Sequence, residues 1–204
     1  MRVLVIGSGA REHALVARLA RDLEPGALIS APGNPGIAAL ARTVSVDASD
    51  IDLLLRLVER DRIDLTVVGP ELPLSLGIVD RFTEAGHAIF GPTAAAARIE
   101  SSKAFAKSFM ARHRVPTARF QTAESLDEAL HVIGNGDLGA PIVLKVDGLA
   151  AGKGVVVAED RATRAAPALP GAQITSATSR SAARRIASAC SRAPAPKTRT
   201  LIPN

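Results

Sequence analysis

The sequence contains no tryptophan, no tyrosine and only one cysteine, Cys190, among its 204 residues. A single cysteine excludes an internal disulfide, and the four histidines stand singly and far apart, which gives no metal-ligand spacing. Five phenylalanines are the only large aromatic residues, so the chain offers little on which nucleic-acid bases stack. We therefore expect no disulfide, no structural metal and no nucleic-acid partner.

The sequence also lacks a long apolar run. A membrane-spanning helix needs about 20 consecutive apolar residues, and no stretch of this chain approaches that length. Arg2 and Arg11 interrupt the apolar beginning that a secretory signal peptide would need. We therefore expect a cytoplasmic protein without a membrane partner.

Acidic residues are missing from one part of the chain. The net charge is +5, but residues 161–204 carry eight basic residues and no acidic one, whereas residues 1–160 carry all 20 acidic residues and a net charge of −3. The basic character thus belongs to the C-terminal segment, which argues again against a nucleic-acid-binding domain. Since this segment is rich in Ala, Arg, Ser and Pro, we predict that residues 161–204 form a largely disordered tail.

Short apolar runs alternate with helical patterns over the first part of the chain. The run Val3–Ile6 predicts a buried parallel strand, because it is β-branched and bounded by glycines. Similar runs at 27–30, 65–68 and 88–90 are separated by helical patterns at 12–22, 51–60 and 76–85. This alternation predicts an α/β fold, with a doubly wound parallel sheet over residues 1–92.

The pattern changes from Thr93 onward. Two helices are predicted, one through Lys103 and one near 125–133, followed by strands at 141–145 and 154–158 that are joined by a glycine-bearing turn. We interpret residues 93–160 as the beginning of a second domain.

Four glycine-containing loops follow predicted strands. The first, residues 7–12, opens a helix, so its backbone N–H groups can hold a phosphate. Glu12 stands where a dinucleotide fingerprint needs a third small residue, which disfavours NAD, FAD and an oxidoreductase. One glycine turn is as often structural as functional, but the loops at 33–36, 69–71 and 91–93 converge with the first on one edge of such a sheet. Convergence favours a small phosphorylated ligand.

The turn between the last two predicted strands carries a second signal. Residues 147–153 place glycines beside a lysine, an arrangement that lets backbone amides close over nucleotide phosphates. Its spacing is not that of a Walker motif, and such a hairpin taken alone is more often structural. Lys145 ends an apolar strand and therefore needs an anionic partner, either a nucleotide phosphate or an internal carboxylate.

Taken together, these segments resemble one family. Residues 3–15 look like the start of the phosphoribosylamine–glycine ligases, also called glycinamide ribonucleotide synthetases. Five later segments match that family's motifs in the same order: 31–36, 64–71, 90–93, 102–105 and 145–155. The resemblance covers residues 1–160, and six ordered motifs are far more specific than any one of them.

The resemblance implies a fold and a reaction. The fold is an N-terminal substrate domain followed by an ATP-grasp domain. The reaction belongs to purine biosynthesis: ATP phosphorylates the glycine carboxylate, and the nitrogen of 5-phosphoribosylamine then attacks the glycyl phosphate. The implied partners are 5-phosphoribosylamine, glycine and ATP, and the implied cofactors are ATP and Mg²⁺.

The resemblance also implies site residues. The ATP-binding residues are Lys103, Lys145, Gly148, Gly152, Lys153 and Gly154. The residues that line the phosphoribosylamine side are Gly9, Arg11, Glu12, Asn34, Gly36, Pro70 and Glu71. Structural alternatives stay open for some of them, since Glu12 can serve a helix N-terminus, Pro70 a turn and Lys103 a solvated helix position.

The sequence departs from the family after residue 160. The family continues with the rest of the ATP-grasp region, including acidic magnesium ligands, and residues 161–204 contain no Asp or Glu. We therefore expect a truncated chain without a magnesium site or the catalytic residues. The abrupt change motivates the hypothesis of a shifted reading frame or a misassembled gene, which a clean in-frame sequence across codon 160 would contradict.

Two other functions remain open at this point. The first is a non-catalytic fragment that binds a phosphoribosyl ligand, which ligand binding without turnover would identify. The second is another ATP-grasp carboxylate–amine ligase, which the substrate dependence of ADP release would identify.

Overall fold

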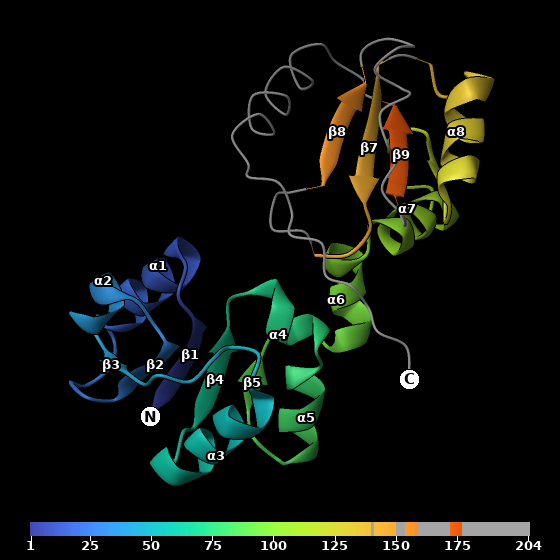
Figure 1. The fold of residues 1–204 in the computed structure, drawn as a ribbon. Helices are drawn as coiled ribbons and strands as arrows, with labels where there is room; N and C mark the ends of the chain where they lie inside the picture. The colour runs from blue at the N-terminus through green and yellow to red at the C-terminus, as the bar shows by residue number, and fades with distance from the viewer. Residues whose placement is uncertain (140, 150–153, 159–171, 177–204) are drawn as a thin grey trace, which may run out of the picture. The chain divides into compact units, whose positions relative to one another are not determined.

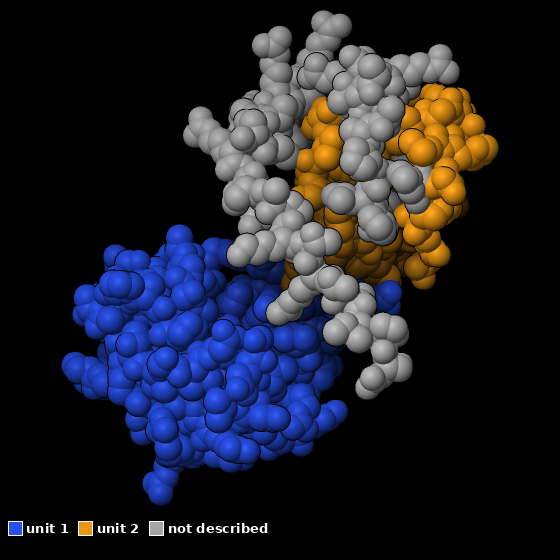
Figure 2. All heavy atoms as spheres, in the orientation of Figure 1, with its two compact units in different colours: residues 1–101 blue, residues 102–204 orange. Residues whose placement is uncertain are grey.

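The chain divides into two compact units, Met1–Ser101 and Ser102–Asn204 (Figures 1 and 2). The computed structural model describes residues 1–139, 141–149, 154–158 and 172–176. Within these ranges no helix is long and apolar enough to cross a membrane.

Unit 1 is built on a five-stranded parallel sheet in the order β3-β2-β1-β4-β5 (Figure 1). The central strand β1 pairs with β2 on one side and β4 on the other, so that Val3 lies opposite both Leu28 and Leu65. The bounds of the strands are β1 Val3–Gly7, β2 Leu28–Pro32, β3 Arg42–Thr43, β4 Leu65–Val68 and β5 Ile89–Phe90.

Helices cover both faces of this sheet. Leu4 and Ile6 of β1 lie in a buried cluster with side chains of α3, α4, α5 and α6, whereas Val3 and Val5 lie in another with side chains of α1 and α2. The alternation of β1 side chains between two apolar cores confirms the predicted doubly wound sheet. The bounds of the helices are α1 Ala10–Leu19, α2 Pro35–Ala38, α3 Ile51–Asp61, α4 Glu71–Ser75, α5 Ile78–Glu84 and α6 Ala94–Ser101.

Unit 1 differs from the predicted elements in three places. The predicted helix over 76–85 is present as α5 but begins at Ile78, because Gly77 takes a left-handed conformation, with φ +85°, and the separate helix α4 before it was not predicted. The helix predicted through Lys103 is likewise interrupted, at Ser102, and its first part, α6, packs on α4. Unit 1 therefore extends to Ser101, beyond the predicted boundary at residue 92. The short elements α2 and β3 were not predicted, since neither is long enough to show a period.

Unit 2 contains a four-stranded sheet in the order β6-β9-β7-β8. The predicted hairpin is present, because β7 and β8 pair antiparallel with Lys145 opposite Val155. Helix α8 contributes Ala129, Val132 and Ile133 to a buried cluster that includes Ile142 of β7. The bounds are α7 Lys103–Arg112, β6 Phe120–Thr122, α8 Leu126–Asn135, β7 Ile142–Val146, β8 Val155–Ala158 and β9 Ala172–Ser176.

Strand β9 corrects part of the prediction for the C-terminal segment. It lies within residues 161–204, for which no regular structure was predicted, yet it pairs antiparallel with both β6 and β7. Pro170 and Gly171 precede this segment, but five residues with a single large apolar side chain, Ile174, give little local indication of a strand. Pairing with strands distant in the sequence therefore decides its conformation. Residues 159–171 and 177–204 lie outside the described residues.

An ion-pair cluster at the end of α3 gives a testable pH dependence. Asp61 accepts hydrogen bonds from Arg60, at 2.9 Å from Nε, and from Arg42 of β3. Despite its burial, the Arg60 and Arg42 guanidinium groups lower the pKa of Asp61 to about 2. Since the unfolded carboxyl titrates near pH ~3.9, the ionised form stabilises the fold above about pH 4, and this contribution is lost as the pH falls toward 2.

We expect Asp61→Asn to lower the free energy of unfolding by about 1 kcal/mol at pH 7, because the exposure of both arginines weakens the pairs. Urea titrations between pH 7 and pH 3 check this, and the difference from wild type should shrink below about pH 4. Asp22→Asn, which removes an exposed pair with Arg18, is the matched control. A difference for Asp61→Asn that stays constant down to pH 3 would contradict the assignment.

Candidate functional site

The carboxyl ends of β1, β2 and β4 meet at one edge of the sheet in unit 1. Because β1 lies between β2 and β4, the chain crosses to opposite sides of β1 here, which is the position where open α/β sheets bind ligands. A cavity of about 390 Å³ opens at this edge, and we call it the switch-point cavity. Its lining comprises Gly7, Ser8, Gly9, Arg11, Glu12, Pro32, Asp47, Ala48, Ser49, Pro70, Leu72 and Pro73.

Glu12 is the most buried charged residue of this cavity. It is 3% exposed, and its Oε2 accepts a hydrogen bond of 2.6 Å from Gly9 N–H. A Cβ atom added at Gly7 would lie 2.6 Å from Glu12 Cγ, and one added at Gly69 would lie 2.1 Å from Oε1. The glycines that end β1 and follow β4 thus leave the space that the Glu12 side chain fills.

This arrangement engages one N–H group of the first glycine loop. The sequence suggested that N–H groups at the start of α1 hold a phosphate, but the Gly9 N–H already donates to Glu12. A carboxylate at a helix N-terminus also offsets the positive end of the helix dipole. Glu12 Oε1 has no hydrogen-bond partner among the described residues. The loop therefore places a buried carboxylate beside its N–H groups, at the position where a dinucleotide-binding loop has a third small residue.

The rim of the switch-point cavity carries a cation and two carboxylates. Arg11 Nη2 donates to Glu71 Oε2 at 3.0 Å. The Glu71 backbone N–H and then Arg11 lower the pKa of the Glu71 carboxyl. Asp47 accepts hydrogen bonds from the hydroxyl and the N–H of Ser49, at 2.5 and 2.8 Å, and these two bonds lower its pKa. Both carboxylates are thus held ionised near neutral pH.

Two predicted site residues support the loops and do not line the cavity. Asn34 donates from Nδ2 to Ser8 O at 2.8 Å and accepts at Oδ1 from Ile37 N–H at 2.9 Å, so its amide links two loops. Gly36 faces His13, whose Cε1 would lie 2.5 Å from an added Cβ. Of the other predicted residues, Gly9, Arg11, Glu12 and Pro70 line the cavity, and Glu71 pairs with Arg11 at its rim.

In unit 2, two of the predicted ATP-binding residues contact one another. Lys103 Nζ donates to Gly148 O at 2.7 Å. The carboxylate of Asp147, which precedes Gly148, accepts from Lys103 N–H at 2.6 Å, Ala104 N–H at 3.2 Å and Ser102 Oγ at 3.0 Å. Burial raises the pKa of Asp147, but these hydrogen bonds outweigh it and leave the pKa below its ordinary value.

Lysines gather on this side of unit 2. Lys107 Nζ donates to Thr117 Oγ1 at 2.7 Å and to Ala118 O at 3.1 Å. Burial and then the positive charge of Lys145 lower the pKa of Lys107. No carboxylate within the described ranges forms an ion pair with Lys145. Within the described residues an internal carboxylate partner for Lys145 finds no support, and a bound anion stays the other candidate.

The remaining residues of the predicted ATP loop are placed only in part. Gly154 closes the turn, since Val146 N–H donates to its carbonyl at 2.9 Å. Gly152 and Lys153 lie outside the described residues. Among the residues that the structure does describe, no group of three or more His, Cys, Asp or Glu side chains is placed to hold a metal ion.

Sequence reasoning did not select Asp47, Ser49, Ser102, Lys107 or Asp147. Ser102 carried a usable signal, because a serine before a helical pattern is a typical N-cap, and its Oγ accepts from Phe105 N–H at 3.1 Å. Asp47 and Ser49 also carried a local signal, since an aspartate commonly accepts from the N–H two residues later. The contacts of Asp147 with Ser102 and Lys103 depend on segments that only the fold brings together.

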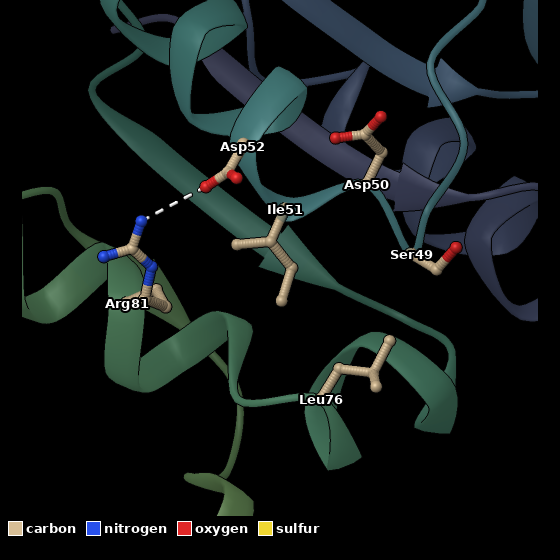
Figure 3. Close-up of a pocket in the computed structure, with 6 residues that line it drawn as sticks. All are labelled: Ser49, Asp50, Ile51, Asp52, Leu76 and Arg81. Atoms are coloured by element: carbon tan, nitrogen blue, oxygen red, sulfur yellow. Dashed lines mark hydrogen bonds and ion pairs between the residues drawn. The ribbon is translucent and has the colours of Figure 1, made fainter. Parts of the chain in front are cut away.

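A second and larger cavity of unit 1 is less suited to a ligand. It measures about 600 Å³ and lies between α3 and the segment from Leu76 to Arg81 (Figure 3). Arg81 points toward Asp52 and pairs with it at 3.1 Å, as Arg11 does with Glu71 in the first cavity, and Asp50 accepts from Leu53 N–H at 3.0 Å as the cap of α3. All three charged residues of this lining are exposed to solvent, so the cavity has no buried charged group. The smaller cavity, which contains a buried carboxylate, is the better candidate.

Two family models match consecutive parts of the chain. Residues 1–100 match a model described as phosphoribosylglycinamide synthetase, N domain, and residues 101–178 match the ATP-grasp (A) domain of the same synthetase. The border between the matches agrees with the border between units 1 and 2. The second match continues past Asp160 and includes β9, whereas the resemblance judged from the sequence ended at residue 160.

Curated relatives carry a consistent name. The chain is 54% identical over 160 residues to the phosphoribosylamine–glycine ligase of Xanthomonas campestris pv. campestris and 51% identical over 160 residues to that of Escherichia coli (strain K12). Each alignment covers 78% of this chain and 37% of the relative. The chain thus spans little more than a third of the length of these relatives.

Solved structures show the same architecture. The crystal structure of phosphoribosylamine–glycine ligase from Thermotoga maritima matches with a TM-score of 0.66 at 25% identity, over 88% of this chain and 44% of that chain. A carboxyaminoimidazole ribonucleotide synthase from Aspergillus clavatus, complexed with ATP, matches with a TM-score of 0.68 at 17% identity, over 87% and 47%. The second match is evidence for the fold alone.

Proposed function

This chain belongs to the phosphoribosylamine–glycine ligase family, and from that premise we propose that it acts in the ATP-dependent joining of glycine to 5-phosphoribosylamine. In this proposal unit 1 binds 5-phosphoribosylamine in the switch-point cavity, and unit 2 binds the phosphates of ATP. The observation that carries the proposal is that three family-like segments, distant in sequence, contribute to the walls and rim of one cavity at the switch point of the sheet. The predicted fourth loop, residues 91–93, is not part of its lining, and residues 47–49 line it instead.

The reaction we propose proceeds in two steps. The glycine carboxylate attacks the γ-phosphorus of ATP, which releases ADP and forms glycyl phosphate. The amine of 5-phosphoribosylamine then attacks the carbonyl carbon, phosphate leaves, and the amine loses a proton. Lys103 and Lys145 offset the charge of the phosphates, because ammonium groups neutralise such anions and neither lysine forms an ion pair with a carboxylate of the described residues.

The chemistry of the switch-point cavity suits a phosphorylated sugar amine. Arg11 supplies a guanidinium for the phosphate, and 67% of its side chain is exposed to solvent. Asp47 and Glu71 supply acceptors for sugar hydroxyls or for the amine. Magnesium, by contrast, has no group of ligands among the described residues, so we assign no step to it.

A non-catalytic role is the second candidate. It is favoured by the switch-point cavity, whose lining residues all belong to unit 1 and are therefore present without the nucleotide-binding part. Under this alternative the chain binds a phosphoribosyl ligand but does not turn over.

ADP release decides between the two candidates. The purified chain is incubated with ATP, Mg²⁺, glycine and freshly generated 5-phosphoribosylamine, and each substrate is omitted in turn. Release that requires both glycine and 5-phosphoribosylamine supports ligation. No release, with ribose 5-phosphate still raising the melting temperature, supports the binding role. ADP release when another carboxylate replaces glycine, or another amine replaces 5-phosphoribosylamine, would indicate a different ligase.

We expect Arg11→Ala to weaken ribose 5-phosphate binding by about tenfold, the value of one charge-assisted hydrogen bond. Isothermal titration measures the change. Arg81→Ala removes an arginine of comparable exposure from the second cavity and should leave the affinity as it is. An equal loss of ribose 5-phosphate affinity in the two variants would show that the net charge of the chain, and not a contact with Arg11, governs binding.

A further inference from the structure

Asp147 caps a helix from a distant part of the chain. It follows the last residue of β7, and its Oδ1 accepts hydrogen bonds from the N–H groups of Lys103 and Ala104, the first two residues of α7. Its Oδ2 accepts from the hydroxyl of Ser102, which itself accepts from Phe105 N–H. Asp147 and Ser102 together satisfy three of the four N–H groups that the first turn of a helix leaves unpaired.

Lys103 is attached to the same strand end at a second point. Its N–H binds Asp147, and its ammonium group binds the carbonyl of Gly148 at 2.7 Å. Lys145 lies on β7, two residues before Asp147. The position of α7 relative to β7, and therefore the separation of the two ammonium groups, depends on the Asp147 carboxylate.

We propose that Asp147 is a positioning residue, which fixes the first turn of α7 to the end of β7 so that Lys103 and Lys145 contact one polyphosphate together. The assignment of the two lysines to ATP rests on the proposed function. Asp147 does not itself bind the nucleotide, because its oxygens are directed to α7 and a carboxylate repels phosphate. An asparagine at position 147 fits less well, since its Nδ2 cannot accept the hydrogen bond that the Ser102 hydroxyl donates to Asp147 Oδ2.

The first test needs no nucleotide. Hydrogen exchange of the Lys103 and Ala104 amides should be at least tenfold faster in Asp147→Ala than in wild type, because the acceptor of both amides is removed. Ser125→Ala removes the cap of α8, where Oγ accepts from Glu128 N–H at 3.2 Å, and should leave exchange at α7 unchanged. Unchanged exchange at Lys103 and Ala104 in Asp147→Ala overturns the proposal.

The second test compares two anions. A polyphosphate engages both lysines, whereas inorganic phosphate engages one. We expect Asp147→Ala to bind ATP about tenfold more weakly than wild type and to bind inorganic phosphate with the wild-type affinity. The ATP affinity of Asp147→Asn should lie between those of wild type and Asp147→Ala. Ser125→Ala, with a comparable loss of melting temperature, should keep the wild-type ATP affinity. A Ser125→Ala loss equal to that of Asp147→Ala, or an equal loss for both anions, overturns the proposal.

The outcomes separate this inference from the proposed function. A wild-type chain that binds no ATP refutes the function proposed for unit 2, and the exchange measurement alone then decides whether Asp147 fixes α7 to β7. A chain that binds ATP with equal affinity in wild type and Asp147→Ala leaves the proposed function standing and refutes the positioning role.

Discussion

Gly69→Ala should destabilise unit 1 by about 3 kcal/mol, although the addition of a single methyl group is usually among the mildest substitutions. The added Cβ would lie 2.1 Å from Glu12 Oε1 and 2.5 Å from Glu12 Cγ. The Glu12 side chain is 3% exposed, so it cannot swing aside without leaving its site between Gly7 and Gly69. Its departure also removes the acceptor of the Gly9 N–H. Urea unfolding of the two proteins measures the difference.

A double-mutant cycle identifies the cause. In a Glu12→Ala background the atoms that the new Cβ meets are absent, so Gly69→Ala should cost less than about 1 kcal/mol, which gives a coupling energy of about 2 kcal/mol. Gly26→Ala is the control, since its Cβ would meet nothing within 4 Å and only its backbone conformation, φ +82°, is unfavourable. An equal cost of Gly69→Ala in both backgrounds would show that Glu12 does not occupy this space.

Lys145→Met should weaken ATP binding by about 2 kcal/mol, or roughly 30-fold, while it leaves the fold as stable as wild type or more so. The reason is electrostatic, because the charge of Lys145 lowers the pKa of Lys107 in the free protein. Removal of that charge relieves a repulsion and deprives a bound polyphosphate of one ammonium group. Methionine keeps the length and apolar contacts of the side chain. Isothermal titration and thermal unfolding measure the two effects.

The control for Lys145→Met is Arg119→Met, which removes an equal charge at an exposed position of unit 2. It should change ATP affinity by less than about twofold at physiological salt, since exposed charges are screened beyond about 8 Å. If Lys145→Met lowers stability and ATP affinity together, Lys145 serves the fold and the assignment to ATP fails.

Local sequence patterns predicted the central strand of unit 1 and the hairpin of unit 2, and they missed strand β9. Val3–Ile6 is a β-branched apolar run, and such a run is buried whichever neighbours it meets, so the central strand of unit 1 was predictable. The hairpin of β7 and β8 was predictable for the same reason, because two apolar runs flank a short glycine-bearing turn. Strand β9 was not, since its conformation comes from pairing with β6 and β7.

The candidate site shows the same division. The position of Glu12 at a helix N-terminus was readable from the sequence, but the space for its carboxylate comes from Gly69, which follows a different strand. Asp147 likewise stands within a recognisable glycine-bearing turn, while its partners Ser102 and Lys103 lie more than 40 residues earlier. Sequence motifs therefore identified the loops, and the fold was needed to assign a role to each side chain in them.

The most direct test of the central claim is a map of amide chemical shifts as the chain is titrated with the ligation product, which carries the phosphoribosyl group and is attached to glycine. The account predicts saturable shifts at Ser8–Glu12, Asp47–Ala48 and Glu71–Leu72, with none at Asp52 or Arg81 of the second cavity. No saturable shift, or shifts that centre on Asp52 and Arg81, would contradict the claim that the switch-point cavity is the phosphoribosyl site.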